Sequence, residues 1–210
     1  MVRIRKVLDS RCFIWALLSI PSIPLLVGLL AGYANGELVE TAEEIRGFAG
    51  QMAAILMVVA LLLSPLLQLR RLSFLRWLMQ RRRYLGVAAF SYAAVHVALY
   101  LLALESLGEG IADLGAPEIA LGWLAFFIFV PLAVTSNQVS ARLLGRWWKQ
   151  VQRLTYLAAV VVLAHWILVE HGPAPAVIFF GPLAVLELLR VWRARKGGRQ
   201  TGQPAGAGAG

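Results

Sequence analysis

Three histidines, His96, His165 and His171, are the residues of this sequence whose chemistry most needs an explanation. Two of them, His96 and His165, lie inside long apolar stretches, where an ionisable side chain is costly unless it faces a bundle interior and finds a partner. His96 follows Arg83 by thirteen residues, and His165 follows Arg153 by twelve. At about 1.5 Å per helical residue, both imidazoles lie roughly 18 to 20 Å beyond a basic boundary. Two histidines at one depth on parallel helices could ligate one metal.

A heme is the metal group that the surroundings of these two histidines favour. No carboxylate or thiol lies at their depth to complete the ligand set of a zinc or iron ion held by protein alone. A heme brings four nitrogens of its own and requires only two axial ligands. Helical spacing also surrounds both histidines with small, apolar or aromatic side chains, which leave room for a macrocycle. These positions are Ala89, Tyr92, Ala93, Tyr100 and Ala103 around His96, and Ala158, Val161, Val162, Leu168 and Val169 around His165.

Two simpler interpretations of the same histidines remain open at this point. Each imidazole could hydrogen-bond a carbonyl or hydroxyl group inside the bundle, or the pair could relay protons. Spacing alone does not decide between these interpretations and a heme. His171 lies beside Gly172 and Pro173 in a short connection, and we interpret it as a solvated loop residue that ligates nothing.

The elements that must position these residues are membrane-spanning helices. The chain has 210 residues, of which 60% are hydrophobic and 15% charged, with a mean hydropathy of +0.72. Its apolar runs are repeatedly as long as the roughly 20 helical residues that cross a bilayer, and they lack the alternation of a barrel strand. We therefore predict an all-α membrane protein with a six-helix transmembrane bundle in residues 1–196, followed by a disordered Gly/Ala-rich tail at 197–210. The predicted spans are 13–32, 48–69, 84–104, 119–136, 151–169 and 174–192.

The charges of the connecting segments predict the orientation of the bundle. Nineteen of the twenty lysines and arginines fall in alternate segments, and the exception is Arg46. The intervening segments carry glutamates and aspartate. The positive-inside rule then puts both termini in the cytoplasm, which gives an N-in/C-in topology. The net charge of +9 is explained by this topology and not by a nucleic-acid partner, because the bases lie between spans.

Other features of the sequence concern details of the bundle. Five prolines lie in or near spans and predict kinks. The single cysteine, Cys12, excludes an internal disulfide and a cysteine-ligated iron–sulfur cluster within this chain. The basic segment 70–83 has an amphipathic pattern, which predicts anchoring at the membrane interface or docking of a cytosolic protein. The prolines are Pro21, Pro24, Pro65, Pro131 and Pro182.

Short motifs from the second predicted span through the fifth add a resemblance to a known family. Each is weak alone, but together they are fairly specific. They are Leu63-Ser64-Pro65; Arg82-Arg83-Tyr84-Leu85-Gly86 with Ala89-Phe90 and Tyr92 ahead of His96 and Tyr100; Pro131-Leu132-Ala133 with Thr135-Ser136; Leu144-Gly145 with Trp148-Lys149; and Arg153-Leu154 with Tyr156 ahead of His165. On these motifs the chain resembles the heme-binding membrane subunits of the bacterial methionine sulfoxide reductase system, the MsrQ (YedZ) family, within the ferric-reductase-like transmembrane superfamily.

This resemblance implies a b-type cytochrome in the bacterial inner (cytoplasmic) membrane, where it is a multi-pass protein. It would take electrons from a cytosolic flavin reductase and pass them to a periplasmic molybdenum-containing methionine sulfoxide reductase. Carried over by position, His96 and His165 match the axial ligands of heme b. Whether FMN also binds, on the basic cytoplasmic face, is left open. No substrate site is expected in this chain itself, which would be an electron-transfer subunit.

The sequence departs from the family pattern at Gln152. Similar chains usually have His-Arg-Leu at the start of the fifth span, and here an amide replaces the histidine. Gln152 precedes His165 by thirteen residues, which places it about 20 Å nearer the cytoplasm. Because a neutral amide is a poor iron ligand, we predict one heme per chain. We expect Gln152 to hydrogen-bond headgroups or the end of the fourth span.

Two other functions remain as alternatives. A ferric or cupric reductase, or a cytochrome that serves another periplasmic acceptor, would use the same heme. A transporter or assembly protein would instead use His96 and His165 as a proton relay and would contain no heme.

Overall fold

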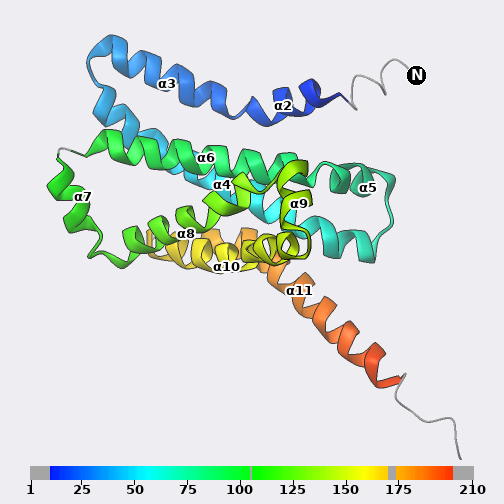
Figure 1. The fold of residues 1–210 in the computed structure, drawn as a ribbon. Coiled ribbons are helices and arrows are strands. Elements are labelled where there is room, and N and C mark those ends of the chain that lie inside the picture. The colour runs from blue at the N-terminus through cyan, green and yellow to red at the C-terminus, as the bar shows by residue number, and fades with distance from the viewer. Residues whose placement is uncertain (1–9, 105, 170–173, 201–210) are drawn as a thin grey trace, which may run out of the picture.

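The computed structural model describes residues 10–104, 106–169 and 174–200, and in these ranges its regular secondary structure is helical (Figure 1). Helices are expected in hydrocarbon because they pair their backbone N–H and C=O groups within one segment. The all-α class is thereby confirmed. The helices are α2 (Arg11–Ser19), α3 (Ser22–Asn35), α4 (Leu38–Leu69), α5 (Ser73–Gln80), α6 (Arg82–Ala103), α7 (Leu107–Asp113), α8 (Pro117–Val134), α9 (Gln138–Leu144), α10 (Arg146–Val169) and α11 (Ala174–Gln200).

Four of the described helices, α4, α6, α8 and α10, are long and apolar enough to cross a membrane, and they match the second to fifth predicted spans. The bent pair α2 and α3 makes a fifth candidate and matches the first. The sixth predicted span lies in α11, whose second half carries Glu187, Arg190 and Arg193. The number of spans established by length and composition is therefore four or five, and the sixth stays a prediction. The predicted tail lies largely outside the described residues.

The bend between α2 and α3 has a clear cause at Pro21. Proline lacks an N–H group, and its ring displaces the carbonyl of the residue four positions earlier, which here is Leu17. The two helices meet at 50°. Tyr92 of α6 donates its hydroxyl to the carbonyl of Leu18 at 2.8 Å, next to this break. The predicted kink is thus confirmed at Pro21, whereas Pro65, Pro131 and Pro182 lie inside continuous helices.

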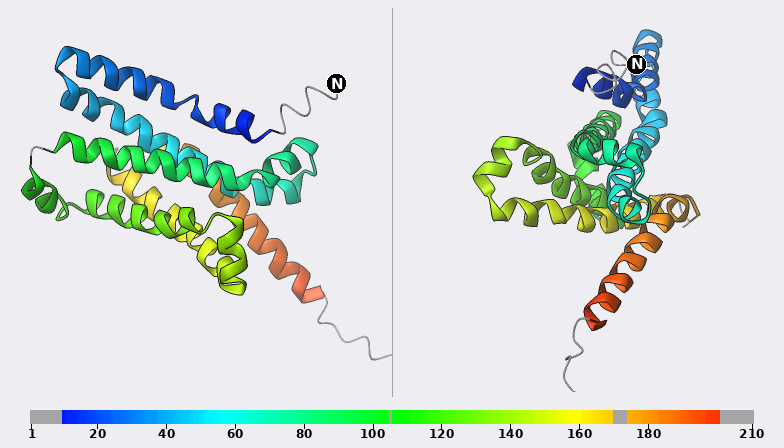
Figure 2. Two further views of the ribbon diagram at one scale, coloured as in Figure 1. Left: turned by 45° about the horizontal axis from the view of Figure 1, so that its top comes forward. Right: turned by 90° about the vertical axis from the view of Figure 1, so that its right-hand side faces the viewer.

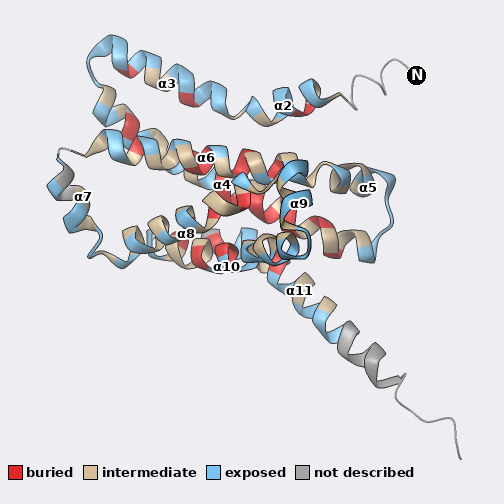
Figure 3. Ribbon diagram, viewed as in Figure 1, coloured by how far each residue is buried: buried red, intermediate tan, exposed pale blue. Residues whose placement is uncertain are grey.

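The core of the bundle is built around α4, which packs most extensively on α6. Buried residues gather along the middle of these helices and of α10 (Figure 3). Many of them are alanines, such as Ala53, Ala89 and Ala158, because small side chains let helix backbones approach closely. The largest fully buried side chains are Met57, Leu61 and Leu63. Phe90 of α6 and Phe126 of α8 stack at a centroid distance of 5.9 Å.

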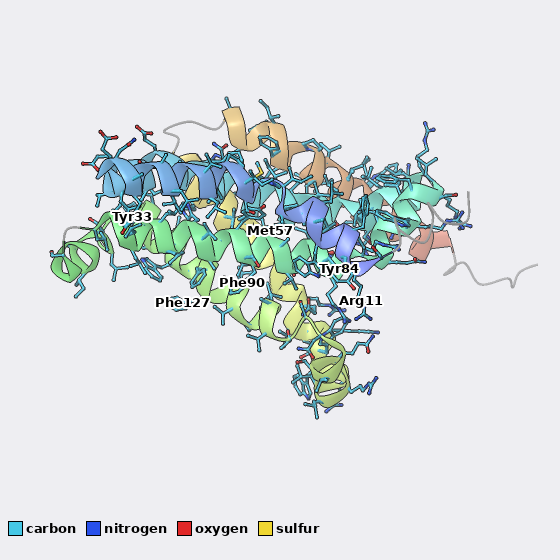
Figure 4. The ribbon with its side chains drawn as sticks, turned by 90° about the horizontal axis from the view of Figure 1, so that it is seen from above. Arg11, Tyr33, Met57, Tyr84, Phe90 and Phe127 are labelled. Carbon is cyan, nitrogen blue, oxygen red and sulfur yellow. The ribbon has the colours of Figure 1, made fainter. Side chains whose placement is uncertain are left out.

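The two ends of the bundle carry opposite charge. One end holds the α3–α4 turn and α7, and the other holds α5, α9 and the projecting part of α11 (Figures 1 and 2). Gly36 makes the α3–α4 turn with a φ of 77°, in the left-handed region that favours glycine. Tyr33 lies at this first end, and Tyr84 and Arg11 lie at the second (Figure 4). We call the first the acidic end (Glu37, Glu40, Glu43, Glu44, Asp113 and Glu118) and the second the basic end (Arg70, Arg71, Arg76, Arg81, Arg82, Arg83, Arg142, Arg146, Lys149 and Arg153).

Candidate cofactor site

The structure brings His96 of α6 and His165 of α10 together inside the bundle. The centroids of the two imidazole rings are 6.3 Å apart, and the ring planes are inclined by 75°. The two residues are far apart in sequence, but each is similarly deep in a helix that runs from the basic end toward the acidic end. His171, the third histidine, lies outside the described residues.

A backbone carbonyl of a neighbouring helix holds each imidazole. His96 Nδ1 lies 2.8 Å from the carbonyl oxygen of Arg46 on α4, and His165 Nδ1 lies 2.7 Å from that of Glu118 on α8. A carbonyl oxygen only accepts hydrogen bonds, so in the neutral form of either ring Nδ1 carries the proton and donates it. Each Nε2 is then left with a free lone pair. This is the tautomer in which a histidine commonly ligates a metal.

Two glycines let the imidazoles approach these carbonyls. Gly50 follows Arg46 by four residues on α4, and Gly122 follows Glu118 by four on α8. A Cβ atom added at Gly50 would lie 2.9 Å from His96 Nδ1, and one added at Gly122 would lie 3.0 Å from His165 Cε1. Any larger residue would therefore push the ring away from its carbonyl. The same arrangement therefore occurs twice in the site. In each case the histidine ring packs against a glycine of the facing helix and donates a hydrogen bond to the carbonyl four residues before that glycine.

The two rings line a cavity between α4, α6, α8 and α10. The space between these helices, counted together with the open solvent at its mouth, is about 970 Å³. The wall is mostly apolar and aromatic, with Tyr100 and Trp123 in edge-to-face contact at 6.4 Å. The lining residues are Gly47, Gly50, Gln51, Ala53, Ala54, Ala93, His96, Val97, Tyr100, Ile119, Gly122, Trp123, Ala125, Phe126, Phe129, Val162, His165, Trp166 and Val169.

The separation of the rings fits a metal held between them. A metal–nitrogen bond is about 2.0 Å long, and a ring nitrogen lies about 1.2 Å from its imidazole centroid. Two imidazoles on opposite sides of one metal would thus have centroids about 6.4 Å apart, against the observed 6.3 Å. Among the described residues, no group of three or more His, Cys, Asp or Glu side chains could hold a metal ion. A metal at this place would need its other ligands from a cofactor, and a heme fits that donor set.

The cavity includes some of the residues predicted from helix periodicity and omits others. Ala93, Tyr100, Val162 and Val169 line it, as expected from their position on the same face as a histidine. Tyr92 does not, because its hydroxyl is engaged at the α2–α3 break. The predicted set also lacked every contribution from α4 and α8, including the two glycines and the two carbonyls. A glycine aligned in depth with each histidine was the signal that could have found them.

Gln152 lies far from this cavity, at the basic end. Its Nε2 donates to the hydroxyl of Thr135 at 3.0 Å and to the carbonyl of Leu132 at 3.4 Å, both at the end of α8. The expectation that Gln152 hydrogen-bonds the end of the fourth span is therefore confirmed. Trp148 supports the same segment, since its Nε1 donates to the carbonyl of Thr135 at 2.9 Å.

Comparison with known proteins places this chain among membrane redox subunits. Residues 49–163 match the family described as the ferric reductase like transmembrane component. The chain is 33% identical to the protein-methionine-sulfoxide reductase heme-binding subunit MsrQ of Ralstonia nicotianae, over 94% of this chain and 91% of the relative. It is 33% identical to MsrQ of Brucella anthropi (86% and 82%) and 32% identical to MsrQ of Brucella ovis (91% and 86%). No solved structure matches the chain.

Proposed function

We propose that this chain, which belongs to the MsrQ family of ferric-reductase-like membrane subunits, is a cytochrome b subunit that delivers electrons to a periplasmic methionine sulfoxide reductase. Membership makes it a multi-pass membrane electron-transfer subunit of a heme-binding family. The finer assignment, with His96 and His165 as the axial ligands of heme b, is our proposal. The observation that carries it is the 6.3 Å separation of two imidazoles whose Nδ1 atoms both donate to carbonyls.

The residues of the chain would prepare the site for this cofactor. The carbonyls of Arg46 and Glu118 fix the tautomer, and each carbonyl also raises the basicity of the ligating nitrogen. The aromatic side chains of Trp123 and Phe126 in the wall would shield a bound cofactor on their side of the cavity. A bound heme would supply the one-electron redox chemistry, while the protein supplies ligation and insulation. The chain therefore needs no substrate site of its own.

The reaction that we propose for the partner enzyme sets the number of electrons that this subunit must deliver in each turnover. Reduction of methionine sulfoxide to methionine consumes two electrons and two protons, breaks the sulfur–oxygen bond and releases the oxygen as water. The reaction restores an apolar side chain to an oxidised envelope protein. This subunit would pass the electrons one at a time to the partner, which we propose to be a molybdenum-containing enzyme.

The charges of the two ends support a direction for this transfer. We propose an N-in/C-in bundle of six spans in the bacterial inner membrane, with the basic end in the cytoplasm. The donor, a cytosolic flavin reductase or an FMN that it supplies, would then meet α5 and α9. Both helices carry arginines, such as Arg76 and Arg142, that suit an acidic protein surface or a flavin phosphate. The periplasmic acceptor would meet the acidic end.

The packing of the half of the bundle nearer the basic end, which we call the inner half, supports one heme per chain. Gln152 is held by the end of α8, and the large side chains of Met57, Leu61 and Leu63 fill the core. In the described part of the chain we find one cavity that histidines line, and it lies between α4, α6, α8 and α10.

An absorption spectrum of the purified protein, together with a heme-to-protein ratio, tests this proposal. We expect a low-spin bis-histidine spectrum and one heme per chain. A protein that shows no Soret band after expression with sufficient heme would contradict the proposal and favour a proton relay.

The second candidate function is ferric or cupric reduction, which the description of the matching family favours. The reduced protein should be mixed separately with a periplasmic methionine sulfoxide reductase and with a ferric chelate. Faster reoxidation by the enzyme supports the first function, and faster reoxidation by the chelate supports the second.

A further inference from the structure

Arg46 is a basic residue in an unusual place. It is the one lysine or arginine between Arg11 and Arg70, and it lies at the acidic end of the bundle. Its side chain is half-buried, with the guanidinium carbon 6.0 Å from the ring centroid of Tyr100. Within the described residues, no carboxylate lies within ion-pair distance of it. The charge of Arg46 is therefore uncompensated by those parts of the protein.

Among the described residues, carboxylates do lie near Arg46 along the chain, but they do not pair with it. Glu43 is exposed and three residues before Arg46 on α4, a spacing at which opposite charges readily pair on a helix surface. Asp113 instead accepts a hydrogen bond from the Tyr100 hydroxyl at 2.9 Å. The guanidinium therefore lies over Tyr100 and not against a neighbouring glutamate.

The position of Arg46 ties it to the cavity. Its carbonyl accepts the hydrogen bond of His96, and Gly50, one turn further along α4, lies against the same imidazole. Tyr100, over which the guanidinium lies, also lines the cavity. Arg46 is thus at the rim of the cavity on the side of the acidic end. A partly buried charge next to an apolar space is costly without a counter-ion, so the molecule that fills the space should bring an anion.

We propose that the guanidinium of Arg46 binds a carboxylate of the cofactor held between His96 and His165. This inference rests on the proposed function. A porphyrin of the heme b type carries two propionate carboxylates on one edge, and the guanidinium fork matches a carboxylate with two parallel hydrogen bonds. The pairing directs the acidic edge of the macrocycle toward the acidic end of the bundle, so the cofactor binds in one orientation. One residue then positions the ligand ring through its carbonyl and the macrocycle through its side chain.

The test compares two hemes in two proteins. Full-length apoprotein, expressed without heme in detergent-soluble form, is titrated with iron protoporphyrin IX and with its dimethyl ester, which has no free carboxylate. Wild type and Arg46→Gln are both titrated, and the ratio of the two dissociation constants is taken for each. Comparing ratios cancels the different partitioning of the two hemes into detergent. We expect the preference for the free acid to fall by about tenfold or more in Arg46→Gln, as for loss of a charge-assisted pair.

Matched variants make the result specific. Arg71→Gln removes an exposed arginine at the basic end and should keep the wild-type ratio. Arg46→Met keeps the aliphatic stem and should lose the preference as Arg46→Gln does, so it decides the test if the glutamine variant does not fold. Equal ratios in wild type and in the folded Arg46 variant would overturn the inference while leaving the histidine ligands in place. A wild-type protein that binds neither heme with a bis-histidine spectrum would overturn the proposed function itself.

Discussion

The half of the bundle nearer the acidic end, which we call the outer half, and the half nearer the basic end, the inner half, use the same four helices in opposite ways. In the outer half, Gly50 and Gly122 remove side chains beside His96 and His165 and leave a cavity. In the inner half, fully buried large side chains such as Met57 fill the same core, and Gln152 turns to the end of α8. The difference lies in more than the histidines themselves. In the half that holds them, the facing helices lose side chains and offer a carbonyl to each ring.

Removal of an axial ligand should have the largest effect on the difference between the two halves, because it takes a histidine out of the outer half. His96→Ala or His165→Ala leaves at most one strong protein ligand for iron, so we expect the low-spin bis-histidine spectrum of the outer half to disappear. Absorption and electron paramagnetic resonance spectra measure this loss.

His171→Ala is the control for these ligand variants, and it should keep the spectrum intact. If His171→Ala removed the heme and His165→Ala did not, His171 and not His165 would be the ligand.

The orientation of the two halves can be tested by an all-or-none reporter assay. A reporter fused after Arg199 should give the signal of a cytoplasmic location. A reporter placed near Glu109 should give the signal of a periplasmic location. Alkaline phosphatase and a fluorescent protein report the two compartments. The reverse pattern would place the histidine pair in the cytoplasmic half and reverse the proposed electron flow.

Filling the space beside one imidazole should have an intermediate effect. Gly50→Ala or Gly122→Ala puts a methyl group about 3 Å from the ring, and the ring must move away from its carbonyl. We expect heme affinity to fall by about tenfold, at the level of 1 to 3 kcal/mol typical of overpacking. Titration of the apoprotein with heme measures the change.

Gly86→Ala is the matched control, because an added Cβ there meets no atom within 4 Å. It should leave heme affinity unchanged. An effect as large as that of the site glycines would mean that helix propensity, and not contact with the imidazoles, controls binding.

The smallest effect is expected from restoring a histidine in the inner half. Thirteen residues before His96 on α6 is Arg83, so the level of Gln152 offers no second histidine on that helix. Gln152→His should therefore leave both the spectrum and the ratio of one heme per chain unchanged. A native protein with two hemes per chain would show instead that another pair of residues builds an inner site.

The sequence predicted the parts of this structure that depend on one helix at a time. The depth of His96 and His165 follows from counting residues, and the spans of α4, α6, α8 and α10 follow from apolar length. The partner carbonyls did not follow, because every helical residue has one and only packing decides which is reached. Helical spacing alone places Tyr92 on the face of His96, but its bond to the carbonyl of Leu18 depends on a break in another helix. The six spans and the orientation stay predictions.

The two carbonyl contacts also bear on how the protein is assembled. His96 depends on α4 for its orientation and His165 depends on α8, so neither hairpin of the bundle holds both rings in place by itself. A pair of imidazoles at the observed spacing exists only when all four helices have packed in register. The spacing of the two imidazoles is therefore a property of the assembled bundle and not of either helix hairpin alone.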